Sequence, residues 1–269
     1  MNKTELIMLG TGNAAVTQCY NTCFAIRNNN KTLLVDAGGG NGILIQLQKA
    51  NIPVTEITDI FITHAHTDHI LGAVWILRVI AQEIQKNNYK SNLNVYSHDK
   101  SLEVLKWICN MTLPKKIVKC IEEKIIFHEI KDGDYFEAIN IHMQCFDIYS
   151  TKEKQYGFKA TLPNGKELVC LGDEPYNNKN QSYVENTDWL LCEAFCLYED
   201  RERFKPYEKH HSTALDAGIV AEKLNTKNLI LYHTEDQTLK TRKEKYSEEA
   251  AKFFKGHIYV PNDLDIFTL

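Results

Sequence analysis

The chain has 269 residues, of which 43% are hydrophobic and 25% charged, and this composition excludes a disordered or fibrous protein. Its 31 basic and 35 acidic residues give a formal net charge of −4, which does not favour binding to a long polyanion such as RNA. The longest apolar run, near residues 70–80, is interrupted by Arg78 and is too short for a bilayer, so no membrane segment is expected.

The first residues lead directly into an apolar stretch at Leu6–Leu9, without the hydrophobic region or cleavage site of a secretory signal. We therefore expect a cytoplasmic protein that starts at Met1. The eight cysteines form no CxxC pair, and we interpret them as reduced, mostly buried thiols.

In the first half of the chain, the alternation of apolar and polar residues predicts strands interleaved with helices. The predicted strands are 5–9, 22–26, 32–36, 59–63 and 93–96, and the predicted helices are 43–50 and about 70–85. Strands 32–36 and 59–63 are short apolar runs that end in polar residues, as buried strands do when they deliver side chains at their carboxyl ends.

The second half shows the same alternation of strands and helices, after a mixed middle segment, between 97 and 133, for which no element is predicted. The predicted strands or extended segments are 134–148, 156–162, 167–171, 189–194, 229–233 and 257–260, and the predicted helices are 212–224 and 246–254. The Asn164-Gly165 pair is a strong hairpin signal. No linker or repeat divides the chain, so a single domain over 1–269 is expected. Two β-rich halves with helices predict two mixed sheets packed face to face, with the helices outside.

The segment His64-Ala65-His66-Thr67-Asp68-His69 places three imidazoles and a carboxylate directly after an apolar strand. These side chains suit zinc or a similar divalent ion. His64 and His66 can share one side of an extended turn, whereas Asp68 and His69 fall at the start of the next helix, so one segment can serve two metals. A polar turn with surface histidines is the alternative, and this density of ligand side chains disfavours it.

This segment has the HxHxDH pattern, and the sequence resembles the metallo-β-lactamase fold superfamily and, within it, the ribonuclease Z-like branch. Other segments resemble the branch's motifs in the same order along nearly the whole chain: Leu9-Gly10-Thr11-Gly12-Asn13-Ala14, Leu34-Val35-Asp36-Ala37-Gly38, Leu171-Gly172-Asp173, Glu193-Ala194-Phe195, His211-Ser212-Thr213 and Leu229-Ile230-Leu231-Tyr232-His233. The resemblance implies a four-layer αβ/βα sandwich, of the α/β (α+β) class, and a metal-dependent hydrolase.

The resemblance also implies two divalent metal ions, with Zn²⁺ expected and Mn²⁺ or Fe²⁺ as alternatives. The first metal would be bound by His64, His66 and Asp173, and the second by Asp68, His69, Asp173 and His233. Their positions agree with these roles, because Asp173 and His233 each follow an apolar strand.

One departure concerns the first metal. The branch has a further histidine a few residues before a Gly-aromatic pair, which corresponds to Gly157-Phe158, but the stretch 146–151 contains none. Asp147 is predicted as the substitute ligand, and without it the first metal site would be weak or vacant. His142 lies too far upstream, and His98 and His128 are interpreted as structural.

The resemblance assigns catalytic roles to Asp68, His211 and Glu193. Glu193 would orient the imidazole of His211, which would protonate the leaving oxygen or stabilise negative charge on phosphate. A polar cap at a helix start is the alternative role for His210 or His211. Asp36 resembles a structural aspartate that hydrogen-bonds to the metal-binding loop.

The segment 10–15 also fits the dinucleotide pattern GxGxxA, but a polar turn and a strand follow it instead of a helix, so NAD binding is not expected.

Two divalent ions about 3.5–4 Å apart can hold a bridging hydroxide and clamp the oxygens of a displacement at phosphorus, which predicts a phosphodiesterase. Ribonuclease Z proteins hold tRNA with a long arm, but 158–171 is only a hairpin here. Because the chain is also acidic, we expect a small phosphodiester, such as a cyclic or short nucleotide, rather than long RNA or tRNA.

Other interpretations stay open. An RNA or tRNA 3′ endonuclease, a lactone or thioester hydrolase, and a non-catalytic metal-binding or dimer module are the alternatives. The aromatic residues Phe195, Tyr198, Phe204 and Tyr207, with Arg201, Arg203 and Lys205, could stack a base and pair a phosphate, or could equally form a surface loop covered by a partner. The segment Trp75–Ile84 could form a homodimer face or the core side of a helix.

Overall fold

The computed structural model describes residues 3–269 and contains two seven-stranded mixed sheets. The first sheet has the order β14-β1-β2-β3-β4-β5-β6. Its strands are β1 (Thr4–Gly10), β2 (Cys23–Asn28), β3 (Lys31–Val35), β4 (Ile57–Phe61), β5 (Leu93–Ser97), β6 (Ile125–Glu129) and β14 (Ile266–Thr268).

The second sheet has the order β13-β12-β11-β10-β9-β8-β7. Its strands are β7 (Tyr135–Ala138), β8 (Ile141–Asp147), β9 (Tyr156–Thr161), β10 (Glu167–Cys170), β11 (Trp189–Glu193), β12 (Asn228–Tyr232) and β13 (His257–Tyr259). The α-helices are α1 (Gly42–Lys49), α2 (Thr67–Gln85), α3 (Asp99–Thr112), α4 (Lys115–Lys124), α5 (Gln181–Val184), α6 (Arg201–Phe204), α7 (Ala214–Lys223) and α8 (Leu239–Ala250).

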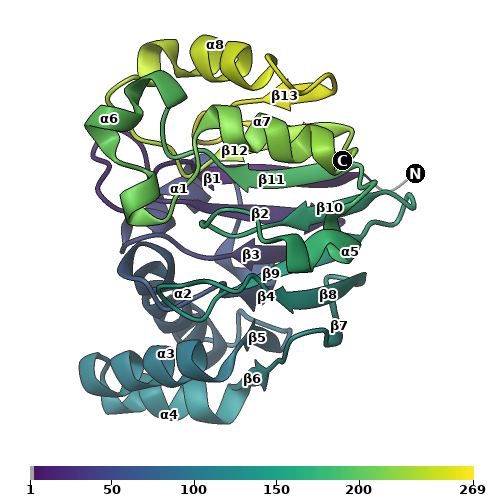
Figure 1. Ribbon diagram of the computed structural model, residues 1–269. Helices are drawn as coiled ribbons and strands as arrows, with labels where there is room; N and C mark the ends of the chain where they lie inside the picture. The colour runs from purple at the N-terminus through teal and green to yellow at the C-terminus, as the bar shows by residue number, and fades with distance from the viewer. Residues whose placement is uncertain (1–2) are drawn as a thin grey trace.

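The strands bury side chains on both faces, which produces the four layers. In β1, Leu6 and Met8 lie in the core between the sheets, whereas Ile7 and Leu9 lie in the core beneath α1–α4. A third core joins the second sheet to α5, α7 and α8. Figure 1 shows α7 and α8 at the top of the view and α3 and α4 at the bottom, with strands between them. The predicted four-layer sandwich of two mixed sheets is therefore confirmed.

The largest differences from the predicted elements lie in two regions, and the short elements α5, α6 and β14 are not predicted either. The mixed middle, for which no element is predicted between 97 and 133, forms α3, α4 and β6. Helix α8 begins at Leu239, well before the predicted start near Tyr246. The buried residue one turn before Tyr246 is Arg242, whose guanidinium donates to Thr234 Oγ1 (2.6 Å) and to the carbonyl of Pro261 (2.8 Å). Helices are predicted from apolar residues at helical spacing, so a helical turn whose buried residue is arginine is not detected.

Parallel pairing brings several strand ends to one rim. Strands β3 and β4 are parallel, and so are β10, β11 and β12. Carboxyl ends of parallel neighbours lie at the same edge of a sheet, where the loops that follow carry binding residues. Of the helices within residues 3–269, none combines the length and hydropathy that crossing a bilayer requires.

Candidate metal centre

The side chains of the site follow strands that end at this rim. Asp36 follows β3, His64 follows β4, Asp173 follows β10, Glu193 ends β11 and His233 follows β12. Asp36 and His233 have positive φ values of 53° and 58°, a left-handed backbone conformation that few residues other than glycine adopt. Such backbone conformations cluster at functional sites, where the surrounding structure holds them in place.

The start of α2 delivers the rest of the HxHxDH segment. His66 is the extended N-cap residue, and Asp68 and His69 lie in the first turn, where the helix dipole favours a carboxylate. Helix α2 approaches the segment after β3 so closely that a Cβ on Gly72 would lie 1.8 Å from the carbonyl oxygen of Ala37. Only glycine permits this contact, which sets the position of Asp68 and His69 relative to the sheet.

Three groups of possible ligand atoms lie together at this rim, and one of them is the set Glu193, His211 and His233. The atoms of His64, His66 and Asp173 lie within 4.8 Å of one another, and so do those of Asp68, His69 and His233. The Oδ2 atom of Asp173 lies 3.5 Å from Nε2 of both His69 and His233 and 3.8 Å from Nε2 of His64. One carboxylate oxygen therefore lies between the other two groups, where a bridging ligand would be expected.

The donor set fits a pair of divalent cations. Nε2 of His69 and both ring nitrogens of His233 are buried and have no hydrogen-bond partner within the protein. Buried polar atoms rarely stay unpaired, and neutral imidazole with carboxylate is a ligand set typical of zinc. His64, His66 and Asp173 would hold one ion and Asp68, His69 and His233 the other, with Asp173 between them.

The protonation states of His64 and Asp173 agree with metal binding, whereas Asp36 and Asp68 outweigh burial and raise the pKa of His69, whose proton a metal ion would displace. Burial lowers the pKa of the His64 imidazole well below its ordinary value, so that ring is neutral. Burial by itself would raise the pKa of Asp173, but His64, His69 and His233 outweigh it and hold that pKa well below the ordinary value. The site therefore has an ionised carboxylate and a neutral imidazole, the forms that bind metal ions.

Asp36 orients two of the imidazoles. Its carboxylate accepts hydrogen bonds from the Thr63 amide (2.8 Å), the Thr63 hydroxyl (2.7 Å) and Nδ1 of His69 (2.7 Å). The Thr63 hydroxyl oxygen also lies 2.9 Å from Nδ1 of His64. His69 then carries its proton on Nδ1 and keeps Nε2 for a metal, whereas Nε2 of His64 lies 2.8 Å from Nδ1 of His66. This contact with the metal-binding loop is the one that the resemblance implies for Asp36.

Asp147, predicted as a ligand of the first metal, lies outside the cluster, so the predicted ligand set is corrected. It lies at the end of β8, outside all three groups of ligand atoms, and its carboxylate accepts a hydrogen bond from the amide of Tyr149 (2.7 Å). Its pairing with Tyr156 keeps it in the sheet, before the loop that reaches the site. The structure therefore does not support Asp147 as the substitute for the missing histidine.

Gln155, which the sequence analysis missed, lies beside the cluster instead. Its side chain is 1% exposed, and Nε2 donates to Oδ1 of Asp173 (2.5 Å) and lies 2.9 Å from Nδ1 of His64. Its Oε1 atom is buried without a hydrogen-bond partner. The contact fixes one oxygen of Asp173 and leaves the other facing the histidines. The only signal in the sequence was a polar residue directly before the predicted strand 156–162.

Glu193 and His211 form the predicted pair. Oε2 of Glu193 lies 2.9 Å from Nδ1 of His211, and Oε1 accepts from the amide of Ser212 (2.5 Å). Burial lowers the pKa of His211 to about 4, so the imidazole is neutral at pH 7. The alternative role as a helix cap is not supported, because Thr213 is the N-cap residue of α7 and forms a capping box with Asp216.

A cavity of about 290 Å³ opens over this cluster. Besides the metal-binding side chains and His211, its lining residues are Asn13, Ala14, Ala15, Lys152, Phe195 and Lys209. The ring of Phe195 stacks on His211 with 4.7 Å between centroids. Of the four aromatic residues predicted to contact a base, Phe195 alone lines this cavity, whereas Tyr198 and Tyr207 are 38% and 50% exposed. Phe195 is therefore the one residue of the four that stays a candidate for stacking on a base in this cavity.

The remaining histidines agree with the structural interpretation. His98 is the buried N-cap residue of α3 and accepts from the amide of Ser101, and His128 bonds to Asn94. His142 is exposed on β8.

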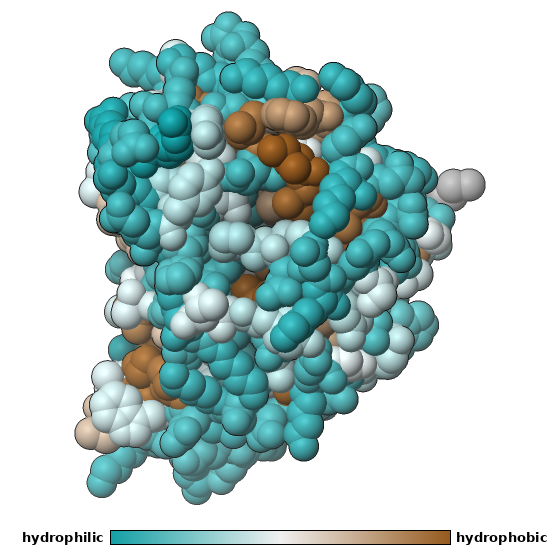
Figure 2. All heavy atoms as spheres, viewed as in Figure 1, coloured by the Kyte–Doolittle hydropathy of each residue, from teal (hydrophilic) through white to brown (hydrophobic). Residues whose placement is uncertain are grey.

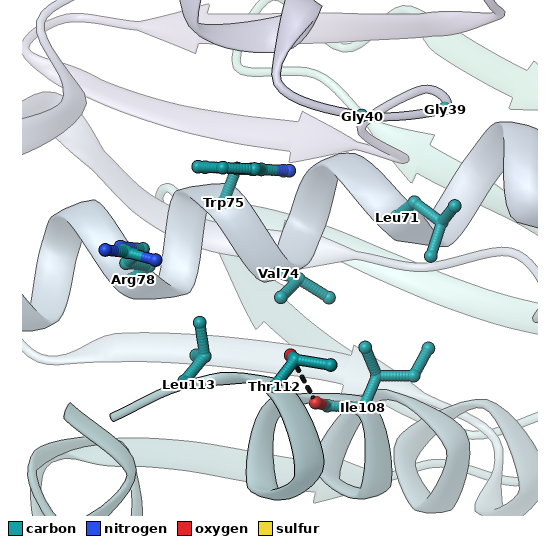
Figure 3. A pocket seen from close by; sticks show the side chains of 9 residues that line it. All are labelled: Gly39, Gly40, Leu71, Val74, Trp75, Arg78, Ile108, Thr112 and Leu113. Atoms are coloured by element: carbon teal, nitrogen blue, oxygen red, sulfur yellow. Dashed lines mark hydrogen bonds between the residues drawn. The ribbon is translucent and has the colours of Figure 1, made fainter. Parts of the chain in front are cut away.

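A larger cavity, of about 360 Å³, lies away from the cluster, between α2 and α3. Figure 3 shows Val74 and Leu71 on α2 pointing toward Ile108, with the ring of Trp75 on the same helix. Within Trp75–Ile84 only Trp75 is exposed, and the buried residues are Ile76, Leu77, Ile80 and Ala81. Hydrophobic residues also gather at the lower left of Figure 2, where Figure 1 places α3, whose Trp107 is 63% exposed. The homodimer stays a prediction, to be tested by light scattering.

Comparison with known proteins agrees with this architecture. The chain is 28% identical over 270 residues to a ribonuclease Z of Nanoarchaeum equitans, covering 85% of this chain and 82% of the relative. The metallo-β-lactamase fold protein YhfI of Bacillus subtilis superposes with a TM-score of 0.76 at 17% identity, covering 99% of both chains. A diphosphatase of the PhnP family superposes with a TM-score of 0.74 at 18% identity, covering 99% of this chain and 98% of the other.

The chain has the metallo-β-lactamase fold and is of the ribonuclease Z-like branch. Because the sequence pattern described as anti-Pycsar protein Apyc1 matches residues 4–259, nearly the whole chain, this protein belongs to the Apyc1 family.

Proposed function

We propose that this protein is a metal-dependent phosphodiesterase that hydrolyses a small phosphodiester, such as a cyclic or short nucleotide. The observation that carries the proposal is the position of Asp173, whose Oδ2 lies between two groups of ligand atoms at the base of a cavity that His211 also lines. Two divalent ions, proposed to be Zn²⁺, would supply Lewis-acid activation of water and of the phosphoryl oxygens.

His211 and Glu193 handle the proton in this proposal. In this proposal the Nδ1–H group of the neutral imidazole donates to Glu193, and Nε2 lies at the cavity with Nζ of Lys152 3.4 Å away. Nε2 of His211 would accept the proton that the attacking water loses, Glu193 would stabilise the imidazolium, and Nε2 would then pass the same proton to the leaving oxygen. Glu193 acts through His211 and keeps the ring in the required tautomer.

The size of the site supports a small substrate. A cavity of about 290 Å³ is at the lower end of the range for small-molecule pockets. Strands β9 and β10 are joined by a tight turn, so the segment that forms a tRNA-binding arm in ribonuclease Z is a plain hairpin here. The names ribonuclease Z and diphosphatase both denote reactions at phosphorus, which supports this chemistry over hydrolysis of a lactone or thioester. An RNA endonuclease is the second candidate, favoured by the 28% identity to ribonuclease Z.

Metal analysis followed by a substrate panel tests the proposal. The purified protein is expected to hold two equivalents of divalent metal and to hydrolyse bis(p-nitrophenyl) phosphate and cyclic nucleotides faster than short RNA or precursor tRNA. Preferred cleavage of precursor tRNA would favour the endonuclease. Activity on a p-nitrophenyl ester with none on the phosphodiester would favour an ester hydrolase, and one metal without turnover would favour a non-catalytic module.

Single substitutions test the assigned residues. Asp68→Ala and His66→Ala are expected to abolish turnover while the protein remains folded, and His142→Ala is the control because His142 is exposed on β8. His211→Ala is expected to lower kcat by roughly 10²- to 10⁴-fold with unchanged metal content. Loss of metal in that variant would instead make His211 a ligand.

The proposed cytoplasmic location is supported by the free state of all eight cysteines.

A further inference from the structure

The loop 150–155, between β8 and β9, is held at both ends by two consecutive carboxylates. Glu174 accepts from the Ser150 hydroxyl (2.6 Å) and the Thr151 amide (3.2 Å) at the start of the loop. Asp173 accepts from Gln155 (2.5 Å) at its end. The segment that lacks the branch's histidine is therefore a fixed part of the site.

Most charged side chains of this loop point away from the cluster. Glu153 pairs with Lys100 (2.6 Å), and Lys154 pairs with Asp99 (2.7 Å). Both partners belong to α3, at a distance from the cavity. Lys152 is the exception, because it lines the cavity together with Asp68, Asp173 and His211.

The surroundings of Lys152 place a cation beside His211. Its Nζ lies 3.4 Å from Nε2 of His211, donates to the carbonyl of Lys209 (3.1 Å) and lies 3.7 Å from Glu174. The side chain is 26% exposed, so it is held in place but can be reached by a ligand in the cavity. A lysine ammonium has three donors and is a common partner of phosphate oxygens.

The charges of the cavity indicate an anionic ligand. The cavity is lined by the carboxylates of Asp68 and Asp173 and by the ammonium groups of Lys152 and Lys209, and Glu174 lies 3.7 Å from Lys152. These five groups carry a net charge of −1, so two divalent ions would leave a net positive site, in which an anion is more stable than a neutral ester.

We propose that Lys152 binds a phosphoryl oxygen of the substrate beside His211 and so makes the site selective for anionic phosphate esters. This inference rests on the proposed phosphodiesterase function. It identifies a substrate-contacting residue that lies outside the HxHxDH motif. The second lysine of the cavity, Lys209, has its Nζ 5.2 Å from the centre of the Phe195 ring.

Lys152→Met and Lys154→Met are the matched test, because the two lysines belong to one loop and only Lys152 lines the cavity. In the metal-loaded protein, Lys152→Met is expected to weaken the binding of inorganic phosphate, measured by calorimetry, by about 10- to 100-fold. It should raise KM for bis(p-nitrophenyl) phosphate by a similar factor. Metal content and Tm should stay at the wild-type values, Lys152→Arg should retain most of the phosphate affinity, and Lys154→Met should behave as wild type.

Wild-type phosphate affinity in Lys152→Met would overturn the inference and leave the phosphodiesterase proposal standing. Loss of metal or a lower Tm in that variant would also overturn it, because Lys152 would then hold the loop rather than the ligand. If the wild-type protein hydrolyses no phosphodiester, the proposed phosphodiesterase function is refuted. The phosphate titration then still decides whether Lys152 binds the anion.

Discussion

Replacing Asp36 with asparagine tests whether one carboxylate determines which ring nitrogens face the metals. Asparagine has nearly the shape of aspartate and tolerates the φ of 53° at this position, so the backbone can stay in place. The substitution removes one acceptor oxygen and adds an amide with two donors.

The hydrogen bonds set the expected magnitude. Oδ1 of Asp36 accepts from the Thr63 amide, and Oδ2 accepts from the Thr63 hydroxyl and from Nδ1 of His69. If the asparagine oxygen takes the Oδ2 position, the buried Thr63 amide is left facing another donor, which costs about 1–3 kcal/mol. If it takes the Oδ1 position, His69 must move its proton to Nε2, the atom that faces Asp173. Metal affinity should then fall by roughly 10- to 100-fold.

Asp59→Asn is the matched control. Asp59 is also buried, and it accepts from Asn94 (3.1 Å), Thr58 (2.7 Å) and the amide of Ile139 (3.2 Å), away from the cluster. Urea unfolding of the metal-free proteins should show both variants destabilised. Competition with a chromophoric chelator should show weaker metal binding only in Asp36→Asn. Wild-type metal affinity in Asp36→Asn, or an equal loss in both variants, would refute the reasoning.

Three further predictions follow from buried polar groups. Gln155→Ala should free Asp173 and lower the metal retained after dialysis, measured by mass spectrometry, and wild-type retention would contradict a positioning role. Burial lowers the pKa of His98, so the unfolded chain takes up a proton before the folded one and stability falls as the pH drops below about 6.5. His98→Asn, which can still cap Ser101, should therefore lose less stability in urea unfolding of metal-free protein between pH 7.5 and 5.5 than the wild type, and an equal loss would refute this. Burial raises the pKa of the Cys19 thiol to about 11, so Ellman's reagent should label the folded protein slowly at pH 8 and all eight cysteines only after unfolding, whereas rapid labelling without denaturant would count against this burial.

Much of the site could be predicted because its motifs resemble those of the ribonuclease Z-like branch, and the positions of its residues at strand ends agree with that resemblance. The HxHxDH segment is contiguous, so local geometry alone places its ligands near one another. Asp173 and His233 lie far away in sequence, but each follows a short apolar strand, and parallel strands bring their carboxyl ends to one rim. The four layers follow in the same way from strands that are apolar on both faces.

The loop 150–155 shows where this reasoning ends. Asp147 has the right chemistry for a ligand, but its pairing with Tyr156 keeps it in the sheet. Which residues of the loop reach the site depends on contacts with Glu174, Asp173 and the start of α3. Those contacts turn Gln155 and Lys152 inward, and no local pattern encodes them.

The sequence by itself determined the layered fold and the side chains that follow its strands, because hydrophobic periodicity and strand ends are local properties of the chain. The tertiary structure alone decided the conformation of the irregular loop and the place of buried polar residues such as Arg242 and Gln155. Burial of such groups is favourable only when partners from distant segments satisfy their hydrogen bonds, and those partners exist only once the chain has folded.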